Sequence, residues 1–203
     1  MIYVNKMQTP AQAPITAPLT AQMNFLFRAR MLARDLATWL RAYQVSLFGG
    51  VGNSEAISQR LYRLPAEYGN ILRVFFGDQP TEQVMNFFTQ YIANLQSLFR
   101  AQMSNDIDVI NNYTQQVYQV TNDAAAYLAS INPYWTQGEW NTLLNAFTNL
   151  QIEQGITFLT KEYERNIDIF DRILSLTNII GDYFSEGLTN YYQLLQQPVN
   201  TPP

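Results

Sequence analysis

Residues 84–120 read VMNFFTQYIANLQSLFRAQMSNDIDVINNYTQQVYQV, with apolar residues at every third or fourth position on both sides of a polar break. In the first half these residues are Val84, Phe87, Phe88, Tyr91, Ile92, Leu95, Leu98 and Phe99. Such spacing places the apolar side chains on one face of an amphipathic helix. Ser104 and Asn105 leave room for only a tight turn, so the stretch predicts two antiparallel helices packed as a hairpin.

The same helical period runs through most of the chain. We expect helices over residues 20–48, 54–76, 81–103, 105–132, 137–160 and 162–195. A helix of about 24 residues spans about 36 Å, so these segments are long enough to lie side by side. No segment alternates with a period of two for long enough to indicate a strand. The pattern predicts an all-α protein, an antiparallel bundle of long helices with one or two of them broken.

A short internal repeat adds a finer expectation. The tripeptide NLQ occurs at residues 94–96 and again at 149–151, and each copy precedes a second helix with Asp near its start. This repeat suggests two related helical hairpins that pack pseudo-symmetrically.

Helix boundaries are marked by residues that favour caps and turns. Asn53 or Ser54 is suited to cap the helix that follows the glycines at 49, 50 and 52. The remaining boundaries are expected at Pro65, which suits a first helical turn, at a turn over residues 77–80 followed by Thr81, and at residues 160–162. The last of these is compatible with either a kink or a turn.

The two ends of the chain lack apolar periodicity. Residues 1–20 are rich in Pro, Thr, Gln and Ala, and residues 197–203 also contain Pro, so we expect a disordered leader and tail. Residues 21–196 are then a single helical-bundle domain. Neither a secretory signal nor an apolar run of the roughly 20 residues that a membrane span needs is present, so we expect a soluble, cytoplasmic protein.

Composition closes several routes to catalysis. The chain has no His and no Cys, which removes the commonest general base, the thiol nucleophile and the commonest transition-metal ligands. A ferritin-like di-iron site, for example, needs Glu-x-x-His pairs. We therefore expect no metal and no cofactor. With no recognisable catalytic motif, an enzyme is the least favoured class of function.

Charge is distributed unevenly along the chain. Residues 28–73 carry seven Arg and three acidic residues, whereas residues 101–203 carry three basic and eleven acidic residues. Because Arg binds anions bidentately, one interpretation is a ligand-binding pocket for an anionic or amphipathic molecule. Its candidate residues are Arg34, Trp39, Arg41, Arg63 and Tyr91. The other interpretation is that the basic half packs on the acidic half. The net charge of −4 argues against nucleic acid as a partner.

The stretch INPYWTQGEW, residues 131–140, gathers aromatic residues at a helix boundary. Thr136 and Glu139 have the spacing of a capping box at a helix start. Pro133, Tyr134, Trp135 and Trp140 then either plug the end of the bundle or form a platform for a ligand. We expect the plug.

Three stretches of the chain resemble a family of uncharacterised helical-bundle proteins from spore-forming Gram-positive bacteria. They contain Leu61, Arg63, Leu64, Pro65, Glu67 and Tyr68 with Phe75, Phe76 and Gly77; Ile131, Asn132, Pro133, Tyr134 and Trp135; and Trp39 with Arg41. The resemblance implies a helical bundle and no particular activity. The family carries several inward-facing His, whereas this chain has none, so a role built on those His is not implied here.

These observations favour a non-enzymatic protein that acts through self-association or a protein partner, with an association with spores or surfaces as a finer expectation. The alternative is a small-ligand binder with an Arg- and Tyr-lined pocket between its helices.

Overall fold

The computed structural model describes residues 21–196, so the leader and tail expected at residues 1–20 and 197–203 lie outside the described residues. Residues 21–196 form seven helices: α1 (Ala21–Gly49), α2 (Ser54–Leu61), α3 (Leu64–Phe76), α4 (Asp78–Ser104), α5 (Ile107–Ile131), α6 (Gln137–Leu159) and α7 (Tyr163–Leu195). No strand occurs within this range. The prediction of an all-α bundle is confirmed.

α2 and α3 together make one broken rod. α2 ends at Leu61, and α3 begins three residues later with Pro65 in its first turn. Proline has no N–H to donate and its ring obstructs the preceding turn, so it is tolerated at a helix start and not inside a continuous helix. This rod is the broken helix that the sequence predicts.

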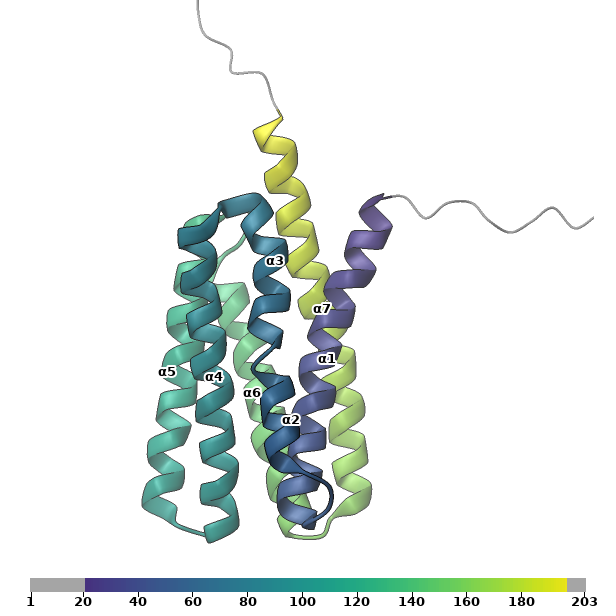
Figure 1. Cartoon of the computed structure of the whole chain (residues 1–203), viewed down its shortest axis with the longest axis vertical. Helices are drawn as coiled ribbons and strands as arrows, with labels where there is room; N and C mark the ends of the chain where they lie inside the picture. Colours follow the sequence, from purple (N-terminus) through teal and green to yellow (C-terminus); the bar gives the residue numbers. More distant parts are fainter. Residues whose placement is uncertain (1–20, 197–203) are drawn as a thin grey trace, which may run out of the picture.

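The rods form a closed ring in which consecutive rods run in opposite directions (Figure 1). α1 packs against α7 and thereby joins the first helix of the chain to the last. α6 contacts α4 and α1 across the ring as well as its neighbours α5 and α7, and α1 also contacts α4 across the ring. The connections α1–α2, α4–α5 and α6–α7 all lie at one end of the bundle, which we call the loop end (Figure 1).

Polar residues fix the helix ends at this loop end. Asn53 and Asp106 cap α2 and α5 by accepting hydrogen bonds from the backbone N–H groups of Ala56 and Val109. Asn105 adopts a left-handed conformation with φ 55°, which ends α4 and delays α5 to Ile107 instead of residue 105.

The uncertain boundary at residues 160–162 is a turn. Lys161 takes a left-handed conformation with φ 62°, and its N–H donates to the Phe158 carbonyl while the Glu162 N–H donates to the Thr157 carbonyl. These two bonds are those of a Schellman motif, which usually places Gly at the left-handed position.

At the other end of the bundle, α4 starts earlier than the sequence indicates. It begins at Asp78 and not at residue 81, because Gly77 with φ 74° makes the turn and Pro80 fits inside the first helical turn. The Thr81 hydroxyl donates to the Gly77 carbonyl over 2.6 Å.

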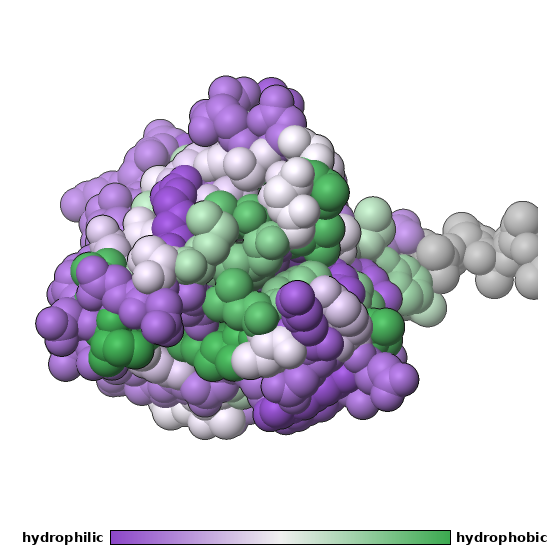
Figure 2. Space-filling view, turned by 90° about the horizontal axis from the view of Figure 1, so that it is seen from below, coloured by the Kyte–Doolittle hydropathy of each residue, from purple (hydrophilic) through white to green (hydrophobic). Residues whose placement is uncertain are grey.

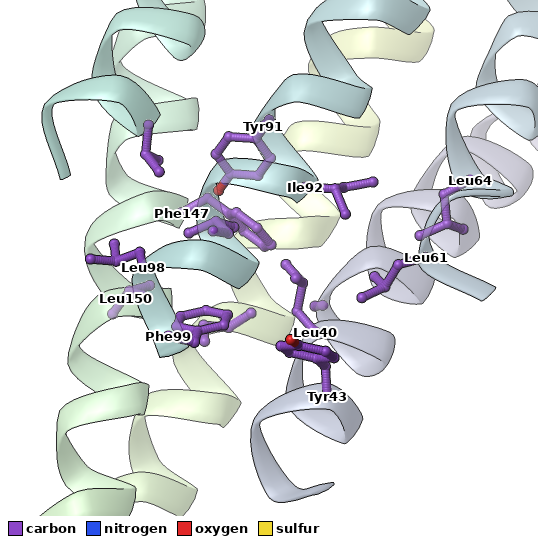
Figure 3. Packing of buried hydrophobic residues seen from close by; sticks show 14 of the residues in the cluster. Leu40, Tyr43, Leu61, Leu64, Tyr91, Ile92, Leu98, Phe99, Phe147 and Leu150 are labelled. Atoms are coloured by element: carbon purple, nitrogen blue, oxygen red, sulfur yellow. The ribbon is translucent and has the colours of Figure 1, made fainter. Parts of the chain in front are cut away.

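The core has two clusters. The first lies toward the loop end and includes Leu40, Tyr43, Leu61, Phe99 and Leu150. In Figure 3, side chains from α1, α2, α3, α4 and α6 point into the space that this first cluster fills. The second cluster lies toward the opposite end and includes Ile71, Leu128, Trp135, Trp140 and Phe184.

Three surrounding helices donate side-chain amide hydrogen bonds to the backbone of α6. Gln44 of α1 donates to the Gln151 carbonyl over 3.0 Å, and Gln102 of α4 donates to the Ile152 carbonyl over 3.4 Å. Asn166 of α7 donates to the Gln154 carbonyl and to the Thr157 hydroxyl, each over 2.9 Å. Because all three amides are buried, these bonds fix the position of α6 along and around its own axis.

The two NLQ copies occupy comparable places. Leu95 with Gln96 and Leu150 with Gln151 are all buried, in α4 and α6, which run in the same direction. Gln96 exchanges hydrogen bonds with Ser58, whereas the Gln151 side chain has no partner among the described residues. The repeated sequence therefore serves two different packing roles.

We expect Asn166→Ala to lower the free energy of unfolding by about 2–3 kcal/mol, because it removes two buried hydrogen bonds to α6 and the acceptor of the part-buried Arg41 guanidinium. Urea unfolding measures the change. Asn112→Ala, at an exposed position of α5, is the control and should stay within about 0.5 kcal/mol of the unchanged protein. Equal effects of the two substitutions would contradict this role of Asn166.

Candidate functional site

The five residues proposed for an anion pocket do not converge. Arg34 and Arg63 are exposed, Trp39 is half-buried with the Arg60 guanidinium 5.3 Å from its ring centroid, and Tyr91 is buried. The helical period places a residue on a face, but the rotation of α1 and of the α2–α3 rod directs these Arg side chains to solvent. The proposed Arg-lined pocket is therefore not formed.

Arg41 contacts residues of α7 instead of lining a pocket. Its Nη1 donates to the Asn166 Oδ1 over 2.7 Å, and its guanidinium carbon lies 4.4 Å from the centroid of the Phe170 ring. Burial lowers the pKa of this guanidinium, and the Asp171 carboxylate acts in the opposite direction. Arg41 thus holds α1 against α7, partly through a cation–π contact.

The uneven charge along the chain is neutralised mostly within short segments. Arg73 pairs with Asp78 and Glu82, and Arg165 pairs with Glu153 and Glu162. Within residues 21–196, the pair Arg30–Asp182 is the one ion pair that joins the basic half to the acidic half. Ion pairs therefore do not hold the basic segment, residues 28–73, against the acidic segment, residues 101–203, along their length.

The aromatic corner at residues 133–140 is divided between core and surface. Trp135 and Trp140 are 2% and 3% exposed, whereas Tyr134 is 42% exposed and Pro133 is also exposed. The Trp135 ring stacks on Phe184 with centroids 5.6 Å apart. The two tryptophans fill this end of the bundle, and Tyr134 lies outside the filled region.

Tyr183 of α7 organises this corner, although it lies 47 residues beyond Thr136 in the chain and was not among the predicted site residues. Its backbone carbonyl accepts a hydrogen bond from the Trp135 indole over 3.2 Å, and its hydroxyl accepts one from the Thr136 N–H over 2.7 Å. The Thr136 side chain caps α6 by accepting from the Glu139 N–H, so only half of the capping box forms. Tyr183 takes the place of the Glu139 carboxylate as partner of the Thr136 N–H.

Gly187 makes the contact between Trp135 and α7 possible. It lies one turn after Tyr183, and a Cβ at this position would collide with the Trp135 indole. Only a helix without a side chain here lets the ring reach the Tyr183 carbonyl. Two glycines that flank an aromatic pair inside one helix, as in the sequence GDYFSEG, are the signal that could have indicated such a close approach.

A cavity of about 140 Å³ lies between the helices where the two core clusters meet. Its walls come from α1, α3, α4, α5, α6 and α7, and they include Tyr91 of the first cluster and Trp140 of the second. No Arg lines it, so of the five proposed ligand-binding residues only Tyr91 belongs to it. The cavity is partly open to the surface.

The loop end presents exposed apolar side chains from all three of its connections. These are Val51, Met103, Ile107, Ile156, Leu159 and Tyr163, which we call the end surface. Figure 2 looks onto this end and shows hydrophobic atoms gathered in its middle with hydrophilic atoms around them. Single exposed apolar residues are ordinary, but a group of them at one end of a molecule is a candidate interaction site.

Within the described part of the chain, no group of three or more acidic residues could hold a metal ion. None of the helices between residues 21 and 196 has the length and apolar character to cross a membrane.

The chain matches no protein-family model, no curated protein and no solved structure. The resemblance to bundle proteins of spore-forming bacteria therefore stays a prediction from the sequence.

We expect Trp135→Ala to cost about 3–5 kcal/mol of unfolding free energy, because it empties the space between α6 and α7 and removes the indole hydrogen bond. Thr136→Ala should cost about 1 kcal/mol through loss of the cap on α6. Urea unfolding of each single variant tests both values. An unchanged midpoint for Trp135→Ala would show that the corner does not stabilise the bundle.

A second pair of variants tests the close approach at Gly187. Gly187→Ala should destabilise the protein by about 1–3 kcal/mol, because the new methyl group overlaps the indole. Gly138→Ala, in the first turn of α6 with nothing within 4 Å of its Cβ position, should be neutral or slightly stabilising. Thermal unfolding of the two variants should separate them, and equal midpoints would refute the argument.

Proposed function

We propose that this protein acts by binding a protein partner through the end surface, without catalysing a reaction. The observation that carries the proposal is the collection of exposed apolar side chains at the loop end. Ile107, Val51 and Met103 are 60%, 55% and 54% exposed, although each belongs to a different helix or connection. These exposed side chains do not pack into the core. Their position together at one end is what a surface that binds another molecule would need.

Charge around the end surface favours a particular kind of partner. The acidic residues near it are Glu55, Asp106, Asp108, Glu153, Glu162 and Glu164, and the basic ones are Arg100, Lys161 and Arg165. Arg165 pairs with Glu153 and Glu162, so these three charges partly offset one another, and the remaining acidic residues still outnumber Arg100 and Lys161. A partner segment that combines apolar side chains with Lys or Arg is complementary to such an end.

A second copy of the chain is a weaker fit. Two identical end surfaces would bring the same excess of acidic residues face to face, and like charges at an interface oppose association. Anionic lipid would be repelled for the same reason. We therefore favour a basic amphipathic segment of another protein over self-association.

A second group of exposed apolar residues lies at the opposite end of the bundle, on the first turns of α1 and the last turns of α7: Met23, Phe27, Met31, Tyr192, Leu194 and Leu195. It comes from two neighbouring helices, whereas the end surface draws on all three connections of the loop end. Val74 is 81% exposed but stands on α3, away from the loop end. A cytoplasmic location and an association with spores stay predictions from the sequence.

A synthetic helical peptide of Leu and Lys tests the proposal, with a Leu and Glu peptide of equal length as its counterpart. We expect the Leu/Lys peptide to bind, and the double variant Met103→Ser with Ile107→Ser to weaken binding at least tenfold, which is about 1.4 kcal/mol. Val74→Ser is the matched control and should bind like the unchanged protein. Fluorescence anisotropy gives the dissociation constants.

Two results would contradict this proposal. If the double variant binds the Leu/Lys peptide as well as the Val74→Ser control does, the end surface is not the site. If sedimentation shows a dimer that only the double variant dissociates, the partner is a second copy of this chain.

A further inference from the structure

The cavity between the two core clusters is chemically distinct from the end surface. Protein side chains leave about 140 Å³ there, close to the roughly 150 Å³ of apolar cavities that hold a benzene molecule or a xenon atom. Native cores contain few spaces larger than a water molecule. The size of this space therefore requires an explanation.

Small residues on three helices create the space. Ala29 and Ala33 of α1, Ala124 of α5 and Gly181 of α7 line it opposite large aromatic rings. A Cβ at Gly181 would lie 2.7 Å from the Arg30 backbone, so α1 and α7 already touch there and cannot close further. The contact between their backbones fixes the width of the cavity on this side.

The walls of the cavity are suited to an uncharged ligand. No charged side chain lines it, and the aromatic rings of Phe87, Phe88 and Phe184 are among its walls. Aromatic rings favour edge-to-face and offset contacts with another ring. A charged group would lose its hydration here without gaining a partner.

Polar groups in the walls are mostly engaged. The Tyr91 hydroxyl bonds with Thr148 over 3.1 Å, and the Thr121 and Thr177 hydroxyls donate to the backbone carbonyls of Tyr118 and Leu174. Burial raises the pKa of the Tyr91 hydroxyl, which therefore stays protonated. The indole N–H of Trp140, another residue of the walls, has no hydrogen-bond partner among the described residues. The site therefore offers mainly shape and apolar contact.

We propose that this cavity is a binding site for one small, uncharged, aromatic molecule of about the size of benzene. The proposal is independent of the end surface, because it rests on different residues and on different chemistry.

Benzene and benzoate are the probes, since they share a ring and differ in charge. Benzene at about ten times its dissociation constant should raise the unfolding midpoint of the full chain by about 3–6 °C. Benzoate at equal concentration should leave the midpoint unchanged. No shift with benzene, or an equal shift with benzoate, would overturn the proposal.

A matched pair of substitutions on α5 locates the site. Ala124→Leu places a larger side chain in the cavity wall and should abolish the benzene shift, whereas Ala126→Leu on the exposed face should keep it. An equal benzene shift in both variants would overturn the assignment.

Crystals of the unchanged protein under xenon pressure decide the matter if Ala124→Leu does not fold. Xenon bound beside Phe88 and Ala124 supports the site, and its absence there overturns the proposal.

Discussion

The hydrogen bonds from buried side-chain amides to the backbone of α6 are the constraint on which the arrangement of the bundle depends. α6 contacts four other helices and exposes little of its own surface. Apolar contacts have no preferred direction, so they define the position of a helix along and around its axis less sharply than hydrogen bonds do. Gln44, Gln102 and Asn166 fix that position, because each must meet one particular carbonyl of α6. A shift of α6 would leave these buried side-chain amides unpaired, which costs more than the bonds themselves contribute.

The opposite half of the bundle is held by the contacts of Trp135 and Tyr183. There the Trp135 indole lies on the backbone of α7 at Gly187 and donates to the Tyr183 carbonyl, while the Tyr183 hydroxyl holds the start of α6. Each half is thus determined by hydrogen bonds between buried polar groups and the main chain. The cavity lies between these two fixed regions, where Gly181 and Arg30 keep α1 and α7 in contact and small side chains leave space.

The end surface and the cavity place different demands on the fold. The end surface needs apolar side chains held outward on short connections, and capping by Asn53 and Asp106 with left-handed Asn105 and Lys161 keeps those connections tight. The cavity needs a rigid frame that does not collapse, which the amides around α6 and the Trp135 contact provide. Neither feature uses His, Cys or a metal, so both fit the composition of the chain.

The sequence by itself determined the helices, most of their boundaries and the broken α2–α3 rod, because apolar periodicity, caps and proline act over a few neighbouring residues. It also indicated that Thr136 begins a helix and that aromatic residues meet beside it. It could not assign Arg34, Arg41 and Arg63 to solvent or core, since that depends on how far each helix is rotated against its neighbours. Tyr183 meets Trp135, and Asn166 meets Arg41, across long stretches of chain, and the cavity exists only where six helices come together. These features belong to the tertiary structure, because they arise from distances between helices that no local pattern encodes.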